Sequence, residues 1–376
     1  MGRAAQQSPL LAARRAERGI ALALALFATV LVGAMVAGAF VAATEEQRQS
    51  ESWRRLGRSL GAAEEGVARE LVSADPQAYA ALAVYPTDSL PVGPRVTGAG
   101  SYTGFAYRLN GRTFLLDVTG ADEPAGVTAL GGARARIGLF AQLRPPRLDL
   151  RAALTSIGPV ELSGVVGVEG ADQAPTGWQS CGPPDSTRAG LRTSGTLRAD
   201  DTTGLAGAPP VWRDPGPIDT VEVPRWAARA GWVLPGGDYA IGPAIRGAGC
   251  DRTVATNWGD PQDPGGVCGS YAPVVVITGD VTVSGGQGQG TLVVDGDLTL
   301  SGSTEFAGVV LVRGTLRSSD SGSHITGAVV AGRVELVGRP VGGGPLVTYS
   351  KCAIDNALRA AATLAPLRSR GWVQVF

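Results

Sequence analysis

The longest uninterrupted apolar stretch of the chain lies near its N-terminus. Residues 20–43 carry no charged side chain, and Thr29 is their only polar one. As a helix they span roughly 36 Å, which exceeds the roughly 30 Å hydrocarbon core of a bilayer. The stretch therefore predicts a transmembrane helix. A cleaved secretory signal peptide is the alternative, although its apolar core is normally shorter, about 7–15 residues.

The apolar pattern changes character after this stretch but keeps a helical period. In residues 44–75, apolar side chains recur at intervals of three or four, with Glu and Arg on the other faces. They are Trp53, Leu56, Leu60, Ala63, Val67 and Leu71. Such a stripe is typical of an amphipathic helix. We expect one continuous helix from about 10 to 72, which ends before Asp75-Pro76 because a residue that precedes proline avoids the helical region.

Residues 76–150 show the pattern of a small β-rich domain. The segments 103–120 and 134–143 alternate or run apolar, and Asn110-Gly111 interrupts the first of them. An Asn-Gly pair between apolar runs is a strong signal of a two-residue hairpin.

A repeat dominates the C-terminal half. The segments VVVITGDVTV, TLVVDGDLTL, VVLVRGTLRS and AVVAGRVEL align on Gly279, Gly296, Gly314 and Gly332, spaced by 17, 18 and 18 residues. Since one such unit cannot bury its own apolar face, successive units must stack. We therefore expect a short β-solenoid (β-helix), right-handed by analogy with other β-helices, with a glycine wherever the coil bends.

Stacking in this register predicts an inward ladder of apolar side chains, which comprises Val276, Val293, Leu311 and Val330. The earlier segment GPVELSG, residues 158–164, resembles GDVTVSG and is expected to supply a further rung. The solenoid would then cover residues 151–350, with a loop-rich insertion at about 171–272.

The C-terminal residues 351–376 are expected to form a helical cap and tail. Ser350 is suited to cap a helix over about 351–363, whose apolar face would cover the open end of the solenoid. The closing WVQVF has the composition of a final strand. The predicted fold is thus mainly β, with a long N-terminal transmembrane α-helix and a C-terminal solenoid capped by a helix.

The distribution of charge predicts how the chain is oriented in the membrane, and the net charge excludes one class of partner. Residues 1–19 contain four arginines and one glutamate, a bias that places them in the cytoplasm and sends the rest of the chain across the membrane. The formal net charge is +0, so no basic surplus exists to bind nucleic acid.

The four cysteines all follow the predicted membrane span, on the side where disulfides persist. Cys250 and Cys268 flank one Gly/Pro/Asp-rich loop and are the favoured single pair, which leaves Cys181 and Cys352 for a second disulfide. Three pairings are possible in principle, and buried free thiols remain an alternative.

Candidate catalytic chemistry is sparse. Asp280 and Asp297 follow successive bend glycines, so they would lie about 4.8 Å apart on neighbouring rungs. Stacked carboxylates can bind calcium or act as acid and base, but aspartates that cap turns are the plainer interpretation. His324, the only histidine, is expected in a solvated turn. We expect neither a cofactor nor a metal site.

Two parts of the chain together resemble a known family. Arg18-Gly19 followed at once by IALALALFATVLVGAMVAG resembles the N-terminus of PilX-type pilus assembly accessory proteins, which are type IV pilin-like proteins. The segments GTLVVDGDLTLSGSTEFAGVVLVRG and YSKCAIDNAL look like the Gly-rich β-helical C-terminal region of large relatives of that group. The resemblance implies peptidase processing between Gly19 and Ile20, yet Leu24 replaces the glutamate found at the fifth position of mature major pilins.

The resemblance implies a non-enzymatic, pilin-like accessory subunit of a type IV pilus or related secretion machinery. Its partners would be the bacterial inner membrane, other pilin-like subunits or assembly proteins, and a surface ligand. The N-terminus would be cytoplasmic, with the bulk periplasmic or extracellular. The alternatives are a membrane-anchored scaffold or adhesin and, third, a carbohydrate-active β-helix enzyme.

Overall fold

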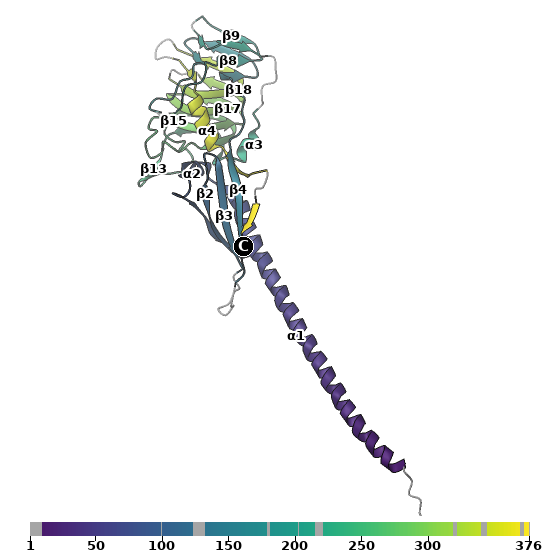
Figure 1. Ribbon diagram of the computed structural model, residues 1–376. Coiled ribbons are helices and arrows are strands. Elements are labelled where there is room, and N and C mark those ends of the chain that lie inside the picture. Colours follow the sequence, from purple (N-terminus) through teal and green to yellow (C-terminus); the bar gives the residue numbers. More distant parts are fainter. Residues whose placement is uncertain are drawn as a thin grey trace, which may run out of the picture.

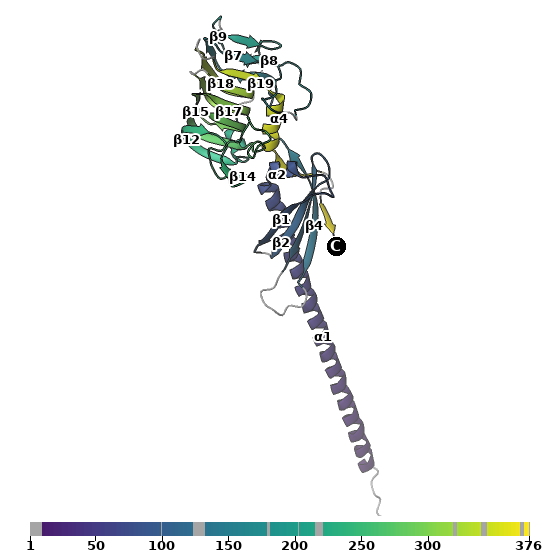
Figure 2. The ribbon, with the colours of Figure 1, turned by 90° about the vertical axis from the view of Figure 1, so that its left-hand side faces the viewer.

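Two β regions follow one long helix, as the computed structural model shows in Figure 1. The structure describes residues 10–98, 100–122, 132–178, 181–201, 203–214, 221–318, 322–339, 344–368 and 372–375. The N-terminal part of the helix projects from the lower end of the molecule (Figures 1 and 2). A small sheet lies along the C-terminal part of the helix, and a large sheet lies above the small one.

Helix α1 is continuous over Leu10–Ser73, which confirms the helix predicted from about 10 to 72. It ends two residues before Asp75-Pro76, and a short second helix, α2 (Pro76–Ala81), starts at once. Asp75 caps α2 by accepting a hydrogen bond from the Gln77 backbone N–H at 2.9 Å.

The small sheet is antiparallel and curls along the second half of α1. Its order is β1-β2-β3-β4-β20, with β21 also paired to β4. Its strands are β1 (Leu90–Val96), β2 (Ser101–Arg108), β3 (Thr113–Ala121), β4 (Arg134–Arg144), β20 (Thr363–Pro366) and β21 (Trp372–Val375). Strand β3 alternates between buried and half-buried positions, so the sheet presents one apolar face to the helix.

The predicted hairpin is present between β2 and β3, but its loop comprises residues 109–112 and is longer than the two residues predicted. The side-chain carbonyl of Asn110 accepts hydrogen bonds from the backbone N–H groups of Arg112 and Thr113, at 3.2 and 3.1 Å. An asparagine that bonds backbone two and three residues ahead is the usual device of such turns.

The C-terminal tail forms a strand, but in a different sheet from the repeats. Strands β20 and β21 both pair antiparallel with β4, more than two hundred residues earlier in the sequence. The tail thereby covers an edge of the small sheet that would otherwise expose unpaired backbone groups.

The large sheet contains thirteen strands, and every pairing within it is parallel. These strands are β5 (Ala152–Ser156), β6 (Val160–Ser163), β7 (Gly167–Glu169), β8 (Ala189–Thr193), β9 (Leu197–Ala199), β10 (Gly204–Ala206), β11 (Val211–Arg213), β12 (Trp232–Ile241), β15 (Val274–Val294), β16 (Leu298–Leu300), β17 (Thr304–Ser318), β18 (His324–Val337) and β19 (Leu346–Tyr349). A separate two-stranded sheet joins β13 (Ile245–Arg246) to β14 (Gly249–Cys250).

The register of the large sheet follows the period of the glycines. Val281 pairs with Leu298, Leu298 with Leu316, and Leu316 with Val334. The predicted inward residues Val276, Val293, Leu311 and Val330 are all buried, at 0%, 0%, 2% and 6% exposed, and the last three occupy paired positions.

The order of the strands in space differs from their order in the chain. The segment predicted to supply a further rung joins the large sheet, because Val160 of β6 pairs with Val334 of β18. The chain therefore enters the sheet in its middle at β5, adds β8 and β11 outward, and returns to the opposite edge at β12. From there β15, β17 and β18 close the gap up to β5.

This topology corrects the expected insertion at about 171–272. Strands β8 to β12 lie within that range, and all five pair in parallel with other strands of the large sheet. Strands β8 to β11 are only three to five residues long, lack a Gly-Asp bend and are recognisable only from their partners. Strand β12 does carry such a pair, Gly237-Asp238, which pairs with Val281 and Thr282 of β15.

The C-terminal helix does not cover an open end. Helix α4 (Lys351–Ala360) has Ser350 as its N-cap, as predicted, with the hydroxyl accepting from the Ala353 N–H at 3.3 Å. It lies along the side of the large sheet, against β15, β17 and β18 (Figure 1). The short helix α3 (Val223–Ala227) also contacts β15.

The docking of α1 on the small sheet depends on glycine at position 120. A Cβ atom there would lie 2.0 Å from the Ser59 carbonyl oxygen and 2.6 Å from the Ala63 nitrogen, both backbone atoms of α1. Neither atom can move without displacing the helix.

We expect Gly120→Ala to lower the free energy of unfolding of the small sheet by about 2 kcal/mol, because overpacking forces the backbone apart. Faster hydrogen exchange of the β3 amides measures the effect. Gly111→Ala is the matched control, since nothing lies within 4 Å of a Cβ atom there. Equal exchange rates in the two variants would contradict the close packing.

Candidate functional site

The first half of α1 is the most distinctive surface of the protein. Among the described residues, α1 is the one helix long and apolar enough to cross a membrane, and no residue of its most apolar window is buried. Its large side chains project on every side, with Leu22 66%, Phe27 66% and Phe40 71% exposed. An apolar surface that surrounds a helix completely requires a lipid or protein environment.

The second half of the same helix is anchored in protein. Ala62, Ala63 and Val67 are fully buried against the small sheet. The sheet also approaches closely at Gly66, where a Cβ atom would lie 2.7 Å from the Tyr102 ring. One rigid helix thus joins an exposed apolar segment to a folded region.

Tyr79 secures the end of α1. Its hydroxyl donates a hydrogen bond to Glu70 of α1 at 2.7 Å, and its ring packs edge-to-face on Phe114 at 5.1 Å between centroids. Burial raises the pKa of Tyr79 far above its usual range, and the Glu70 carboxylate raises it further. The tyrosine therefore remains a neutral donor that ties α1, α2 and the sheet together.

The residues predicted for N-terminal processing, Gly19 and Ile20, lie within α1. Leu24, at the position where the resemblance would place glutamate, is 62% exposed.

Asp280 and Asp297 form a ladder of hydrogen bonds between successive repeats. The candidate calcium or acid-base chemistry would instead use the two carboxylates together as a pair. Asp280 accepts a hydrogen bond from the Asp297 N–H at 2.8 Å, and Asp297 accepts one from the Thr315 N–H at 2.7 Å. Each carboxylate thus holds the backbone of the next repeat.

This ladder also explains two of the bend glycines. A Cβ atom at Gly296 would lie 2.5 Å from an oxygen of Asp280, and one at Gly314 would lie 2.3 Å from an oxygen of Asp297. Close approach, and not a left-handed backbone, is the reason for glycine at these two positions.

The electrostatics of Asp297 oppose a role as a general acid. The hydrogen bond from Arg317, followed by that from the Thr315 N–H, holds the pKa of this carboxyl below its ordinary value. A general acid near neutral pH needs a raised pKa. Arg317 also bonds Glu335 at 2.9 Å, so the cluster forms a chain of ion pairs.

His324 is exposed, as expected, but it begins strand β18 and is not in a turn. Its register neighbours are Glu305 on β17 and Leu346 on β19. No group of three or more His, Cys, Asp or Glu residues suited to a metal ion occurs in the described part of the chain.

Both expected disulfides are present. Cys250 pairs with Cys268, which confirms the favoured pair, and Cys181 pairs with Cys352. The first closes a loop beside β14, and the second ties the start of α4 to the segment between β7 and β8. Their sequence separations are 18 and 171 residues.

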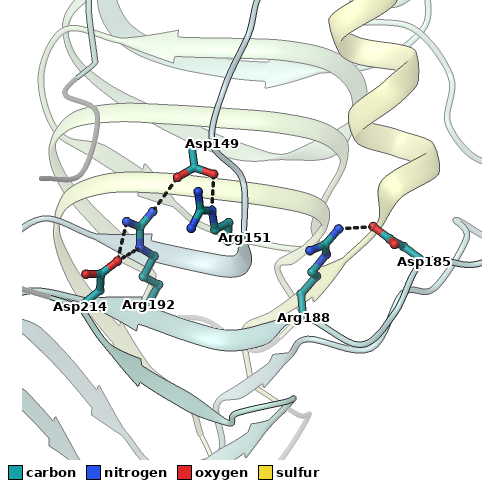
Figure 3. A network of polar contacts seen from close by, with 6 residues as sticks. All are labelled: Asp149, Arg151, Asp185, Arg188, Arg192 and Asp214. Carbon is teal, nitrogen blue, oxygen red and sulfur yellow. Dashed lines mark hydrogen bonds and ion pairs between the residues drawn. The ribbon is translucent and has the colours of Figure 1, made fainter. Parts of the chain in front are cut away.

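A polar cluster at the far edge of the large sheet was missed by sequence reasoning. Arg192 on β8 is 4% exposed and donates to Asp214 at 2.7 and 3.1 Å. It also approaches Asp149 at 3.5 Å, and that carboxylate bonds Arg151 at 2.6 Å (Figure 3). The Arg192 guanidinium carbon lies 4.9 Å from the centre of the Trp212 ring.

This cluster joins three segments that are well separated in the chain. Asp149 precedes β5, Arg192 belongs to β8 and Asp214 follows β11. A buried guanidinium requires such partners, because an unpaired buried charge is costly. The only sequence signal was alternating charge among short apolar runs, which is too common to be diagnostic.

No protein-family model and no curated protein matches this sequence. Among solved structures, the competence-associated pilin ComZ from Thermus thermophilus aligns over 85% of this chain and 97% of its own, with 11% identity and a TM-score of 0.24. A TM-score this low does not indicate a shared fold.

We expect Asp297→Asn to lower stability by about 0.5–1 kcal/mol at pH 7, because a partly exposed ion pair contributes roughly that amount. The contribution of a carboxyl with a depressed pKa is present above its unfolded pKa, near 4, and is lost as the pH falls through the folded pKa. The difference from wild type should therefore vanish in strong acid.

Unfolding midpoints measured from pH 7 down into strong acid test this dependence. Asp280→Asn is the control, because Asp280 forms no ion pair with a described arginine within 4.0 Å. A difference for Asp297→Asn that is independent of pH would contradict the ion-pair explanation.

Peptide mapping without reduction should recover the two disulfides as 250–268 and 181–352. Cys181→Ala with Cys352→Ala should lower stability more than Cys250→Ala with Cys268→Ala, by about 2 kcal/mol, because the longer loop is constrained more in the unfolded chain. Recovery of either of the other two pairings would contradict the structure.

Proposed function

We propose that this protein is a membrane-anchored, pilin-like accessory subunit of a type IV pilus or related secretion machinery, which acts by assembly or surface binding and catalyses no reaction. The division of α1 into an exposed apolar half and a half docked on a β sheet carries this proposal. A helix built in this way can sit in a bilayer, or among other such helices, while it holds a folded head at a defined distance.

The charge distribution supports a cytoplasmic N-terminus in the inner membrane. The arginines that precede residue 20 favour retention on the cytoplasmic side, which sends the β regions across. The two disulfides fit this orientation, since such bonds persist outside the reducing cytoplasm. The bulk would then be periplasmic or extracellular.

We further propose that the large sheet is a β-solenoid. In support, parallel strands repeat with register steps of 17 and 18 residues, and apolar side chains stack from rung to rung. In this view residues 76–150 with the C-terminal strands form one domain, and the solenoid forms a second domain that presents its far edge to a surface ligand.

The partners implied are other pilin-like subunits or pilus assembly proteins, which would contact the apolar half of α1. Processing between Gly19 and Ile20 would expose this half at the mature N-terminus. Leu24 in place of glutamate removes the group that would pair with a neighbouring amine in the filament, and so favours an accessory role.

The absence of glutamate at Leu24 equally favours a second candidate function. In it, the protein is a structural scaffold or adhesin that keeps its N-terminal membrane anchor uncleaved. The mature N-terminus separates the two candidates. We expect protein purified from membranes to begin at Ile20, with an N-methylated amine, and to co-purify with pilin-like or assembly proteins. Gly19→Val, which should block processing, is the control.

An intact Met1 in the wild-type protein, or a cut near residue 43, would contradict the pilin-like processing and favour the scaffold. Release of the protein by salt or alkaline washing, without detergent, would contradict the membrane anchor itself.

A further inference from the structure

A cavity of about 540 Å³ lies where the small sheet, α2, α4 and the disulfide loop of Cys250 and Cys268 meet. Four arginines line it: Arg108, Arg112, Arg252 and Arg359. No aspartate or glutamate is among the described residues that line it, although the chain as a whole has as many acidic as basic residues. The site is therefore strongly cationic.

Two of these guanidinium groups are fixed in place by the fold. Arg108 donates to the backbone carbonyls of Ala80 and Leu82 at 2.9 and 2.8 Å, and it also bonds the carbonyls of the Asn110-Gly111 turn. These acceptors are neutral, so the charge of Arg108 is held rigidly but not cancelled. Arg252 bonds Asp75 at 2.8 Å and lies over the Tyr271 ring at 5.1 Å.

The other two arginines have no carboxylate partner among the described residues. Arg112 and Arg359 are exposed, and neither forms an ion pair within 4.0 Å there. Asp355, one turn before Arg359 on α4, lies outside the cavity lining. Both guanidinium groups are thus free to bind an anion that enters the cavity.

Most of the remaining walls are small and apolar, and include Ala78, Ala81, Leu143 and Pro145. Gln77, Ser270 and Asn356 are uncharged polar groups in the lining. Arginine binds carboxylate and phosphate oxygens in a bidentate manner, with charge-assisted hydrogen bonds. Apolar walls lower the local dielectric constant and strengthen such bonds.

We propose that this cavity binds a small multivalent anion that carries carboxylate or phosphate groups. Arg112 and Arg359 hold the anion directly, while Arg108 supplies a fixed positive field. Since the cavity joins the two β regions, a bound anion also tightens their junction. The site is independent of the membrane anchor and of N-terminal processing.

Isothermal titration of the detergent-solubilised full chain with citrate and, separately, with pyrophosphate tests the site. We expect at least one of them to bind with a Kd below about 1 mM. Binding of citrate alone identifies a carboxylate ligand, binding of pyrophosphate alone a phosphate ligand, and binding of both a general anion site.

The variant Arg112→Gln with Arg359→Gln should weaken binding at least about tenfold, because it removes the two guanidinium groups free to form charge-assisted hydrogen bonds. Arg198→Gln with Arg213→Gln is the matched control, since it removes the same charge from exposed positions on β9 and β11. This control should bind within about twofold of wild type.

Three outcomes would overturn the proposal. They are failure of both anions to bind below about 1 mM, unchanged affinity in Arg112→Gln with Arg359→Gln, and an equal loss in the control. Because all four substituted residues are exposed, equal melting midpoints will verify that the variants remain folded.

Discussion

The close approach of α1 to the small sheet is the contact on which the rest of the molecule depends. At Gly120 the sheet lies against the helix backbone itself, with no side chain between them. Ala62, Ala63 and Val67 complete a tightly packed face, and Tyr79 secures the helix end through Glu70. Since a helix is rigid over this length, fixing its second half also fixes the direction of the exposed apolar half.

The large sheet is held by a different principle, the repetition of one register. Parallel pairing places the apolar residues of one repeat beside those of the next, and α3 and α4 pack against the same sheet. Asp280 and Asp297 reinforce this register by accepting hydrogen bonds from the backbone of the following repeat. At the far edge, the ion pairs of Arg192 with Asp149 and Asp214 tie together segments from three parts of the chain.

The chain passes from the small sheet to the large sheet and later back again, so two connections join the two β regions. After β4 it enters the large sheet at β5, and after α4 it returns to the small sheet as β20 and β21. The Cys181–Cys352 disulfide holds the start of α4, from which that return begins. The arginine-lined cavity lies at this junction, bordered by elements of both regions.

Local patterns in the sequence determined several features of this protein. The helix over Leu10–Ser73, the Asn110-Gly111 hairpin, the Ser350 cap and the 17–18-residue register all follow from signals within a few residues or one period. Their physical cause is local, because apolar spacing, turn geometry and capping act between near neighbours in the chain.

Only the tertiary structure decided where those elements go. It placed β8 and β11 beyond β5, returned β12 to the opposite edge, put the last strands beside β4 and laid α4 along the side of the large sheet. Short strands such as β9 and β10 carry too little apolar surface to be recognised alone. Their stability comes from backbone pairing with partners far away in the sequence, and no local pattern specifies those partners.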